Sequence, residues 1–436
     1  MIQDAQTPAS QWGIKNDLPF LFSLLGLMTV VSILFWWISG WNTLLGGMSR
    51  MPNAVYFLEN GKLIDPLGPI TTVYYAFWMI FFGKTVMATK IASLIAFMAF
   101  VMIFYKIACL LFENRWAARL SAVVLATSPF LYRETTTAAW ELPSIFILCC
   151  YLLFALQLYR KGDLCYAVGL GLTSGFGPLV KGALIPLGFT TLLYFGILGF
   201  TGRSGKSLIK PIVLSTLLCF AIILSFMTRN LIREGYFSLS DPVYSATTFY
   251  HGNNPRAYKG FPQFDDQYQV LSEQIEKSVP GGDRIALAKA YKRAAWDYIL
   301  SDPFSHIVVV GFKKIWCGFK FYGREEILHW GPLVPLAFFG LWTLARQGKY
   351  TLIVHLVFLQ YMFVAFVFFG FSRYRHAYMP IFVLLATSAI FWLWNRFRNR
   401  TFYWIMTAYL LVFPIAYFFA KPLRALWLYY IPQLRM

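Results

Sequence analysis

The chain has 436 residues, of which 58% belong to the hydrophobic set and only 13% are charged. An ordinary soluble domain is about 45–50% apolar and about 25% charged. This composition therefore excludes a soluble enzyme, a disordered protein and a fibrous repeat. One soluble core could not bury so much apolar surface, so a bilayer must cover the rest. The composition predicts an all-α polytopic membrane protein.

The net charge is +19, from 38 Lys and Arg against 19 Asp and Glu. The long hydrophilic stretch Arg229–Ser305 holds nine of each, so the whole excess lies in or beside apolar segments. Cations at membrane depth suit lipid headgroups and phosphates, and we expect no nucleic-acid partner. The six cysteines show no CxxC or Cys/His spacing, so we expect no disulfide framework and no zinc site.

Apolar segments of about 20 residues can span a bilayer as helices, and the chain contains about eleven candidates. The first, Leu18–Gly40, lacks a small-residue cleavage site and is expected to be a retained helix. The others are Thr85–Phe112, Ala117–Tyr132, Leu142–Leu158, Cys165–Val180, Ala183–Gly199, Pro211–Thr228, Trp330–Leu344, Tyr350–Phe371, Tyr378–Trp394 and Phe402–Ala420. Two aromatic-rich segments, Ile70–Gly83 and Phe304–Phe321, are expected to lie along the membrane interface.

These segments predict three parts: an N-terminal transmembrane module (1–228) with a first outer loop (41–83), a large outer loop with its interfacial helix (229–327), and a C-terminal transmembrane module (328–436). We expect a mixed outer loop domain. Tyr236–Asp266 is rich in turn residues, whereas Arg284–Leu300 has helical spacing. Glycines 169, 171, 175 and 177 lie inside one span and indicate close helix packing.

With the N-terminus in the cytoplasm, the basic clusters 203–210 and 396–400 lie inside, as positively charged loops tend to. The count of basic residues is close, and the opposite orientation stays open. In the first orientation Glu59, Asp65 and Glu141 lie at the outer face. Ionisable groups at membrane depth are costly and usually functional, so these acids are candidate catalytic residues. Each also has a plain alternative, as a solvated loop acid or as a charge at a helix N-terminus.

Basic residues at the same face are the candidate phosphate ligands. Lys181 lies between two apolar spans, where an anion would offset the cost of its charge. Arg373 and Arg375 end another span and offer planar donor groups to phosphate oxygens. All three could instead extend to water or to headgroups. His376 is expected to be a local hydrogen-bonding residue. The chain contains no GxxxxGK[ST], GxGxxG, HExxH or GxSxG motif.

Several blocks over Leu111–Lys181 resemble, in order, those of the GT-C superfamily of membrane glycosyltransferases. They are FENRWAARLSA from Phe112, SPF from Ser128, WELP from Trp140 and LVKG from Leu179. YHGNNP, from Tyr250, is similar to an outer-loop element of bacterial members, and RYR, from Arg373, to a late basic cluster. The most similar branch contains the lipid A aminoarabinose transferases and the protein O-mannosyltransferases.

The resemblance implies transfer of one sugar from a polyprenyl phosphate to a glycan, lipid or protein acceptor at the outer face of a bacterial inner membrane. It implies that Lys181 and Arg375 bind the lipid phosphate, that Glu141 is the second-loop acid, and that Tyr250, Asn253 and Asn254 belong to an acceptor or sugar loop. No cofactor is implied, and a divalent metal stays open.

One departure from the family pattern concerns the first loop. The family usually places Asp, or an Asp-Glu pair, about fifteen residues before the position of Gly61, and this chain has Gly46 and Gly47 there. Glu59 or Asp65 could take over as the base, the enzyme could work by a different mechanism, or the chain could be inactive as a transferase. A lipid-linked saccharide flippase without transferase activity is the alternative. For the transferase, we expect at least one of the three acids within about 10 Å of Lys181 Nζ, a span that one sugar phosphate can bridge.

Overall fold

The computed structural model describes residues 17–44, 49–65, 68–112, 114–200, 208–257, 266–279, 283–319, 324–368, 370, 372–397 and 400–412. Within these ranges the regular structure is helical and contains no strand. Seven helical segments are long and apolar enough to cross a membrane. The all-α polytopic fold is therefore confirmed, and the chain is an integral membrane protein.

The long apolar helices follow the expected segments closely, because about 20 consecutive apolar residues leave little choice in a bilayer. They are α1 (Leu18–Ser39), α4 (Val86–Leu111), α7 (Glu141–Lys161), α9 (Leu187–Phe200) with a preceding 3-10 turn (Gly182–Leu184), α10 (Ile209–Glu234), α16 (Arg324–Ala345) and α18 (Ser372–Arg396). Three apolar helices are shorter: α3 (Pro69–Phe82), α8 (Leu164–Val180) and α17 (Leu352–Val367). Helices α10 and α16 each cross one of the expected module boundaries, and the division into modules stays a prediction.

The predicted span Ala117–Tyr132 is wrong. The chain forms two short helices there, α5 (Arg115–Ala126) and α6 (Pro129–Glu134). Ser128 is extended and Pro129 starts the new helix, because proline lacks an N–H and disfavours the helical conformation of the residue before it. The predicted span Phe402–Ala420 lies only partly within the described residues, where 400–412 are helical.

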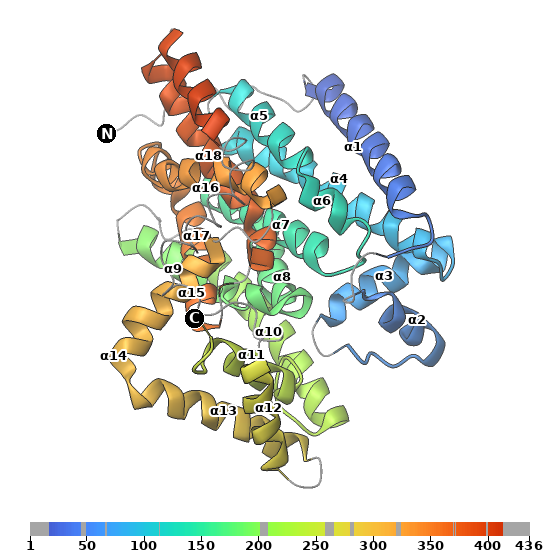
Figure 1. Cartoon of the computed structure of the whole chain (residues 1–436). Coiled ribbons are helices and arrows are strands. Elements are labelled where there is room, and N and C mark those ends of the chain that lie inside the picture. Colours follow the sequence, from blue (N-terminus) through green and yellow to red (C-terminus); the bar gives the residue numbers. More distant parts are fainter. Residues whose placement is uncertain are drawn as a thin grey trace, which may run out of the picture.

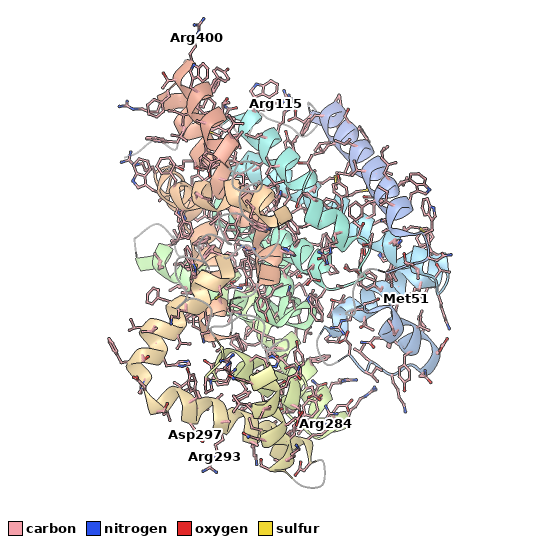
Figure 2. All side chains as sticks on the ribbon, viewed as in Figure 1. Met51, Arg115, Arg284, Arg293, Asp297 and Arg400 are labelled. Atoms are coloured by element: carbon pink, nitrogen blue, oxygen red, sulfur yellow. The ribbon has the colours of Figure 1, made fainter. Side chains whose placement is uncertain are left out.

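The two ends of the helix bundle differ in the charged residues and the loops that lie there. Asp17, just before α1, accepts hydrogen bonds from Tyr105, Arg115 and Arg119. Figure 2 shows Arg115 and Arg400 at the same end of the molecule, and Arg284 and Arg293 at the other end. Figure 1 places α11, α12 and α13 at this second end. The large hydrophilic loop therefore lies opposite the end that carries Arg115 and Arg400.

The large outer loop is more helical than predicted. It contains α11 (Pro242–Gly252), α12 (Asp266–Lys277) and α13 (Arg284–Ser301), of which α13 matches the expected helix. The irregular chain expected over Tyr236–Asp266 is wrong for residues 242–252. Asp241 starts α11 by accepting the backbone N–H of Tyr244 at 3.0 Å, and proline occupies the first turn. Buried tyrosines and alanines of these helices form a small core of their own.

The segment after α13 is helical, as expected of an interfacial element. It consists of α14 (Pro303–Ser305), a π turn (His306–Val310) and α15 (Gly311–Phe319). Phe312 and Trp316 are exposed, whereas Lys314 on the same helix is buried. Exposed aromatic side chains suit a position at the membrane interface. The first outer loop forms a smaller pair, α2 (Met51–Asn60) packed on α3.

Close packing of α8 on α10 depends on glycine. A Cβ atom at Gly171 would lie 2.6 Å from the carbonyl oxygen of Ser215, and one at Gly175 would lie 2.9 Å from the Ile222 side chain. Such approaches are tighter than any real side chain permits, so only glycine allows this helix spacing. The interpretation of these glycines as packing residues is confirmed.

Candidate functional site

Lys181 and Glu141 form a buried ion pair. Glu141 is the first residue of α7, and Lys181 is extended directly after the last residue of α8. Their Oε1 and Nζ atoms lie 3.5 Å apart, and the two residues are 0% and 6% exposed. Because α7 and α8 pack side by side, the start of one helix meets the end of the other. The expectation of an acid within about 10 Å of Lys181 Nζ is confirmed.

An open pocket lies over this pair and measures about 880 Å³ with its mouth included. We call it the Lys181 pocket. Its described lining comprises Pro69, Trp140, Pro178, Lys181, Gly182, Ala183, Ile185, Leu239, Ser240, Tyr244, Ser245, Thr248, Val364, Phe368 and Tyr374. Lys181 is the one charged side chain among these described residues, and its Nζ lies 5.7 Å from the centre of the Tyr374 ring. The pocket therefore offers an anion one ammonium group, which Glu141 also contacts, in a largely apolar wall.

Asp65 lies beside this pocket and caps α3. Its carboxylate accepts the Thr72 hydroxyl at 2.6 Å and the Gly68 backbone N–H at 3.3 Å. Arg50 Nε lies 3.4 Å from the same carboxylate. The backbone at the start of α3 lies close to the segment that contains Lys181, since a Cβ at Gly68 would lie 2.7 Å from the carbonyl oxygen of Val180. Asp65 is therefore close in the fold to the residue before Lys181.

A second, more polar pocket includes Asp65, and we call it the Asp65 pocket. Its described lining comprises Leu63, Ile64, Asp65, Phe226, Arg229, Asn230, Glu234, Tyr236, Leu239, Ser240, Asp241, Pro242, Arg284 and Ile285. Leu239 and Ser240 line both pockets. The two pockets are therefore neighbours on either side of this short segment, with Lys181 in one and Asp65 in the other.

Arg375 follows Tyr374 in α18 and is fully buried. Its guanidinium carbon lies 5.1 Å from the centre of the Trp330 ring, a cation–π contact. His376 stacks on the same tryptophan, and its Nδ1 lies 3.9 Å from Glu134. The local role expected for His376 agrees with these contacts. The side chain of Arg373 lies outside the described part of the chain, so its role stays a prediction.

Glu59 is not brought into this region by any described contact. It pairs with Lys84 at 3.0 Å, and the two side chains are 52% and 45% exposed. An exposed pair of this kind contributes about 0–1 kcal/mol to stability. Of the three predicted acids, the structure therefore brings Glu141 to Lys181, places Asp65 in the adjoining pocket and leaves Glu59 on the surface.

The three residues expected in an acceptor or sugar loop are buried and engaged in local contacts. The Tyr250 ring packs against Tyr268 and Tyr291 in the loop core. Asn254 donates to the carbonyl oxygen of Tyr250 at 2.7 Å. Asn253 donates to the carbonyl oxygen of Val367, at the end of α17, at 3.0 Å. These contacts tie the outer loop to the bundle, and a role in acceptor binding stays a prediction.

Lys314, in α15, contacts the same junction between the outer loop and the helix bundle, which we call the joint. Its ammonium donates to the carbonyl oxygen of Gly252 and to the side-chain oxygen of Asn253, each at 3.1 Å. Both partners are neutral, so burial lowers the pKa of Lys314 to about 7. His306, which contacts the same oxygen of Asn253, has its pKa lowered to about 4, first by burial and then by Lys314. Only Lys314 therefore titrates near neutral pH in this joint.

Attachment of α11 to the bundle is expected to strengthen as pH rises. The pKa of Lys314 is lower in the folded protein than in the open chain, so the open state binds more protons between pH 7 and about 10. Below pH 7 the cost of burying the ammonium is present in full. We expect the hydrogen-exchange protection factors of residues 242–252 to rise about tenfold from pH 7 to 8.5. The Lys314→Met variant should show no such rise, and an equal rise in both proteins would contradict this assignment.

Among the described residues, no group of three or more His, Cys, Asp or Glu side chains could hold a metal ion. In this part of the chain the cations and carboxylates of the site are paired with one another. The dependence on a divalent metal stays open, as it was from the sequence.

Several residues of this region were not assigned a role from the sequence. Trp140 forms part of the Lys181 pocket, and Arg50 lies over its ring at 4.2 Å. Glu134 accepts from Thr137 at 3.0 Å and faces His376. Leu239 and Ser240 come from the outer loop. Trp140 precedes Glu141 in one of the family-like blocks, which was a usable signal, whereas the sequence gives none for Leu239.

Residues 68–228 match the family model described as dolichyl-phosphate-mannose-protein mannosyltransferase. No curated protein sequence matches the chain significantly. Two solved structures of the Archaeoglobus fulgidus oligosaccharyltransferase AglB are similar in fold. The complex with an inhibitory peptide and dolichol-phosphate has a TM-score of 0.57 and 16% identity, covering 88% of this chain and 51% of that one. The apo form has a TM-score of 0.58, 16% identity and coverage of 88% and 52%.

ArnT from Cupriavidus metallidurans, bound to undecaprenyl phosphate, covers 84% of this chain and 77% of its own at 11% identity, and its TM-score of 0.39 supports no conclusion. The chain spans about half the length of the oligosaccharyltransferase chains that it matches. At this low identity the match to AglB shows the fold alone. The resemblance to the GT-C superfamily is confirmed over residues 68–228 by the mannosyltransferase family model, and the similarity to AglB shows a shared fold over 88% of the chain.

Proposed function

We propose that this protein transfers one sugar from a polyprenyl phosphate to an acceptor at the outer face of a bacterial inner membrane. The observation that carries the proposal is the buried Lys181–Glu141 pair under an open, largely apolar pocket. A lipid phosphate needs a cation with apolar walls around it, and this pocket offers both. The dolichyl-phosphate-mannose family over residues 68–228 and the dolichol-phosphate complex of AglB support the same class of donor.

The chemistry requires little of the protein beyond binding and orientation. The bond between the sugar carbon C1 and the phosphate oxygen breaks, the acceptor oxygen bonds to C1, and the acceptor proton passes to a base. Lys181 would stabilise the negative charge of the departing polyprenyl phosphate, and Arg375 would add positive charge from the adjoining turn of α18. Glu141 would hold the Lys181 ammonium in place as a positioning residue.

Asp65 is the proposed base. It lines the pocket next to that of Lys181, so an acceptor hydroxyl in the Asp65 pocket could reach a sugar whose phosphate occupies the Lys181 pocket. Its hydrogen bonds to Gly68 and Thr72 fix the carboxylate in one orientation. The opposite end of the bundle carries Arg115 and Arg400 (Figure 2). Arg284 and Arg293, at the end that carries the site, belong to the long outer loop, and the charge of a long loop has little influence on orientation. The basic residues at the Arg115 end therefore favour a cytoplasmic position for that end and an outer position for the site.

The proposal predicts that Lys181→Ala abolishes sugar turnover. The full-length protein in liposomes is given undecaprenyl-phosphate-linked sugars and bacterial membranes as a source of acceptors, and release of undecaprenyl phosphate is measured. Loss of the cation should slow the release about 100-fold or more, because charge stabilisation at the departing phosphate is lost. Asp65→Asn should slow it comparably, with the protein still folded.

Lys84→Ala is the matched control, because Lys84 also pairs with a glutamate but on the surface. It should turn over at the rate of the unmodified protein. Release that survives in Lys181→Ala contradicts the proposed site. Movement of the lipid-linked sugar across the bilayer without any release of undecaprenyl phosphate contradicts the proposed activity and supports a flippase.

A further inference from the structure

Two apolar grooves run along α10, one on each side of its contact with α8. The first, which we call the α9 groove, lies between α9 and α10 and includes Phe189, Thr216, Phe220 and Ile223. The second, which we call the α3 groove, is formed by Ile70, Phe176, Leu179, Leu218, Ala221 and Ile222. At 100° per residue, positions 216, 220 and 223 lie on a different face of α10 from positions 218, 222 and 225. Ser215 and Cys219, which are buried, lie between the two faces at the edge of the α9 groove, which they also line.

Each groove continues into a different one of the two pockets. Ile185 lines both the α9 groove and the Lys181 pocket. Phe226 and Arg229 line both the α3 groove and the Asp65 pocket. A ligand with an apolar chain and a polar head therefore has two separate approaches. If one ligand occupied each approach, their polar head groups would meet at Leu239 and Ser240, the segment that lines both pockets.

The charged residues of the Lys181 pocket and of the Asp65 pocket indicate that the two pockets bind lipids with different polar head groups. Lys181 is the one charged side chain among the described lining residues of its pocket, which suits a phosphate. The described lining of the Asp65 pocket carries two basic residues, Arg229 and Arg284, against three acidic ones. This nearly neutral set, with Asn230, Tyr236 and Ser240 beside it, is rich in hydrogen-bonding groups and suits a polyhydroxylated head without a phosphate.

Arg229 marks the change from the apolar groove to the polar pocket. It donates to the carbonyl oxygen of Leu63 at 3.0 Å and to the Asn230 side chain at 2.7 Å. The contact to Leu63 joins α10 to the first outer loop, two residues before Asp65. A lipid chain in the α3 groove would thus end where the Asp65 pocket begins.

We infer that the acceptor is itself a membrane lipid with a sugar head. Its chain occupies the α3 groove and its head occupies the Asp65 pocket, while the donor occupies the α9 groove and the Lys181 pocket. This inference rests on the proposed function and narrows its acceptor from a glycan, lipid or protein to a glycolipid. Two lipids that approach along opposite sides of one helix can meet without either head leaving the membrane interface.

The test uses the full-length protein in lipid nanodiscs and a glucosyl-diacylglycerol that carries a photoreactive group in its acyl chain. Crosslinked peptides are mapped by mass spectrometry. We expect labelling on the face of α10 that holds Leu218, Ala221 and Ser225, and undecaprenyl phosphate should not displace it. Ala221→Trp, at an exposed position inside the groove, should reduce this labelling about tenfold by filling the groove.

Thr216→Trp is the matched control on the other face of α10. It should leave the glycolipid labelling unchanged and weaken the binding of undecaprenyl phosphate, whereas Ala221→Trp should leave that binding unchanged. The inference is overturned if undecaprenyl phosphate displaces the glycolipid, if Ala221→Trp has no effect, or if a phosphatidylcholine probe labels the same face equally. Labelling needs no turnover, so a wild-type protein that releases no undecaprenyl phosphate would contradict the proposed function separately.

Discussion

Replacing Glu141 with Gln is expected to lower the free energy of unfolding by about 3 kcal/mol or more, because the Lys181 ammonium would keep its buried position without its carboxylate. Both residues are almost inaccessible to solvent, and the ion pair is 3.5 Å long. Lys181→Met should cost a similar amount by leaving the carboxylate of Glu141 without the ammonium. The measurement is thermal or denaturant unfolding of the purified protein in detergent.

The double variant Glu141→Leu/Lys181→Met separates stability from function. Replacing both partners of a buried ion pair with apolar groups of similar size is often neutral or stabilising, so the double variant should be clearly more stable than either single one. It should nevertheless release no undecaprenyl phosphate, because the cation at the pocket is gone. The corresponding changes in the exposed Glu59–Lys84 pair should cost about 0–1 kcal/mol. Additive costs at Glu141 and Lys181 would contradict the idea that they act as a pair.

The apolar segments were predictable because a bilayer imposes one length and one conformation on them. The exception, Ala117–Tyr132, shows the limit of counting apolar residues: Pro129 breaks the helix within an otherwise apolar run. The signal was in the sequence, since a serine before a proline is a common helix start. Asp241 followed by proline was an equal signal for α11, and the turn residues around it obscured it.

The candidate site was predictable only in part, for a physical reason. Glu141 and Lys181 each adjoin an apolar segment, so helices that traverse the same bilayer bring them to the same depth. Which acid pairs with Lys181 depends on which helices are neighbours, and the residue pattern does not contain that information. Asp65 and Glu59 are both in the first outer loop, yet Asp65 is buried at the start of α3 and Glu59 faces solvent. The wall made by Leu239 and Ser240 exists only once the outer loop has folded over the bundle.

The second large effect is expected at Gly340, in the contact between α16 and α18. A Cβ atom there would collide with the backbone of Leu385, so Gly340→Ala must push the two helices apart. Overpacking of a tight core costs about 1–3 kcal/mol, and a backbone neighbour that cannot turn aside favours the upper end of that range. Because α16 carries Trp330 and α18 carries Arg375, the shift should also disturb their contact. A fall in the unfolding midpoint of the purified protein checks this expectation.

Substitutions at two other glycines test whether contact with a backbone atom causes the loss of stability expected for Gly340→Ala. Gly196 in α9 has nothing within 4 Å of the added Cβ, so Gly196→Ala should be neutral or stabilising by up to about 1 kcal/mol. At Gly169 the three atoms nearest to an added Cβ all belong to the ring of Phe154, the closest at 2.7 Å. Replacing that ring by Phe154→Leu should therefore offset part of the cost of Gly169→Ala. No side-chain truncation should offset the cost of Gly340→Ala in this way, since Leu385→Ala leaves the backbone carbonyl of residue 385 in place. If Leu385→Ala restored the unfolding midpoint of Gly340→Ala, the collision would lie with a side chain and the helices would not be held at this distance by their backbones.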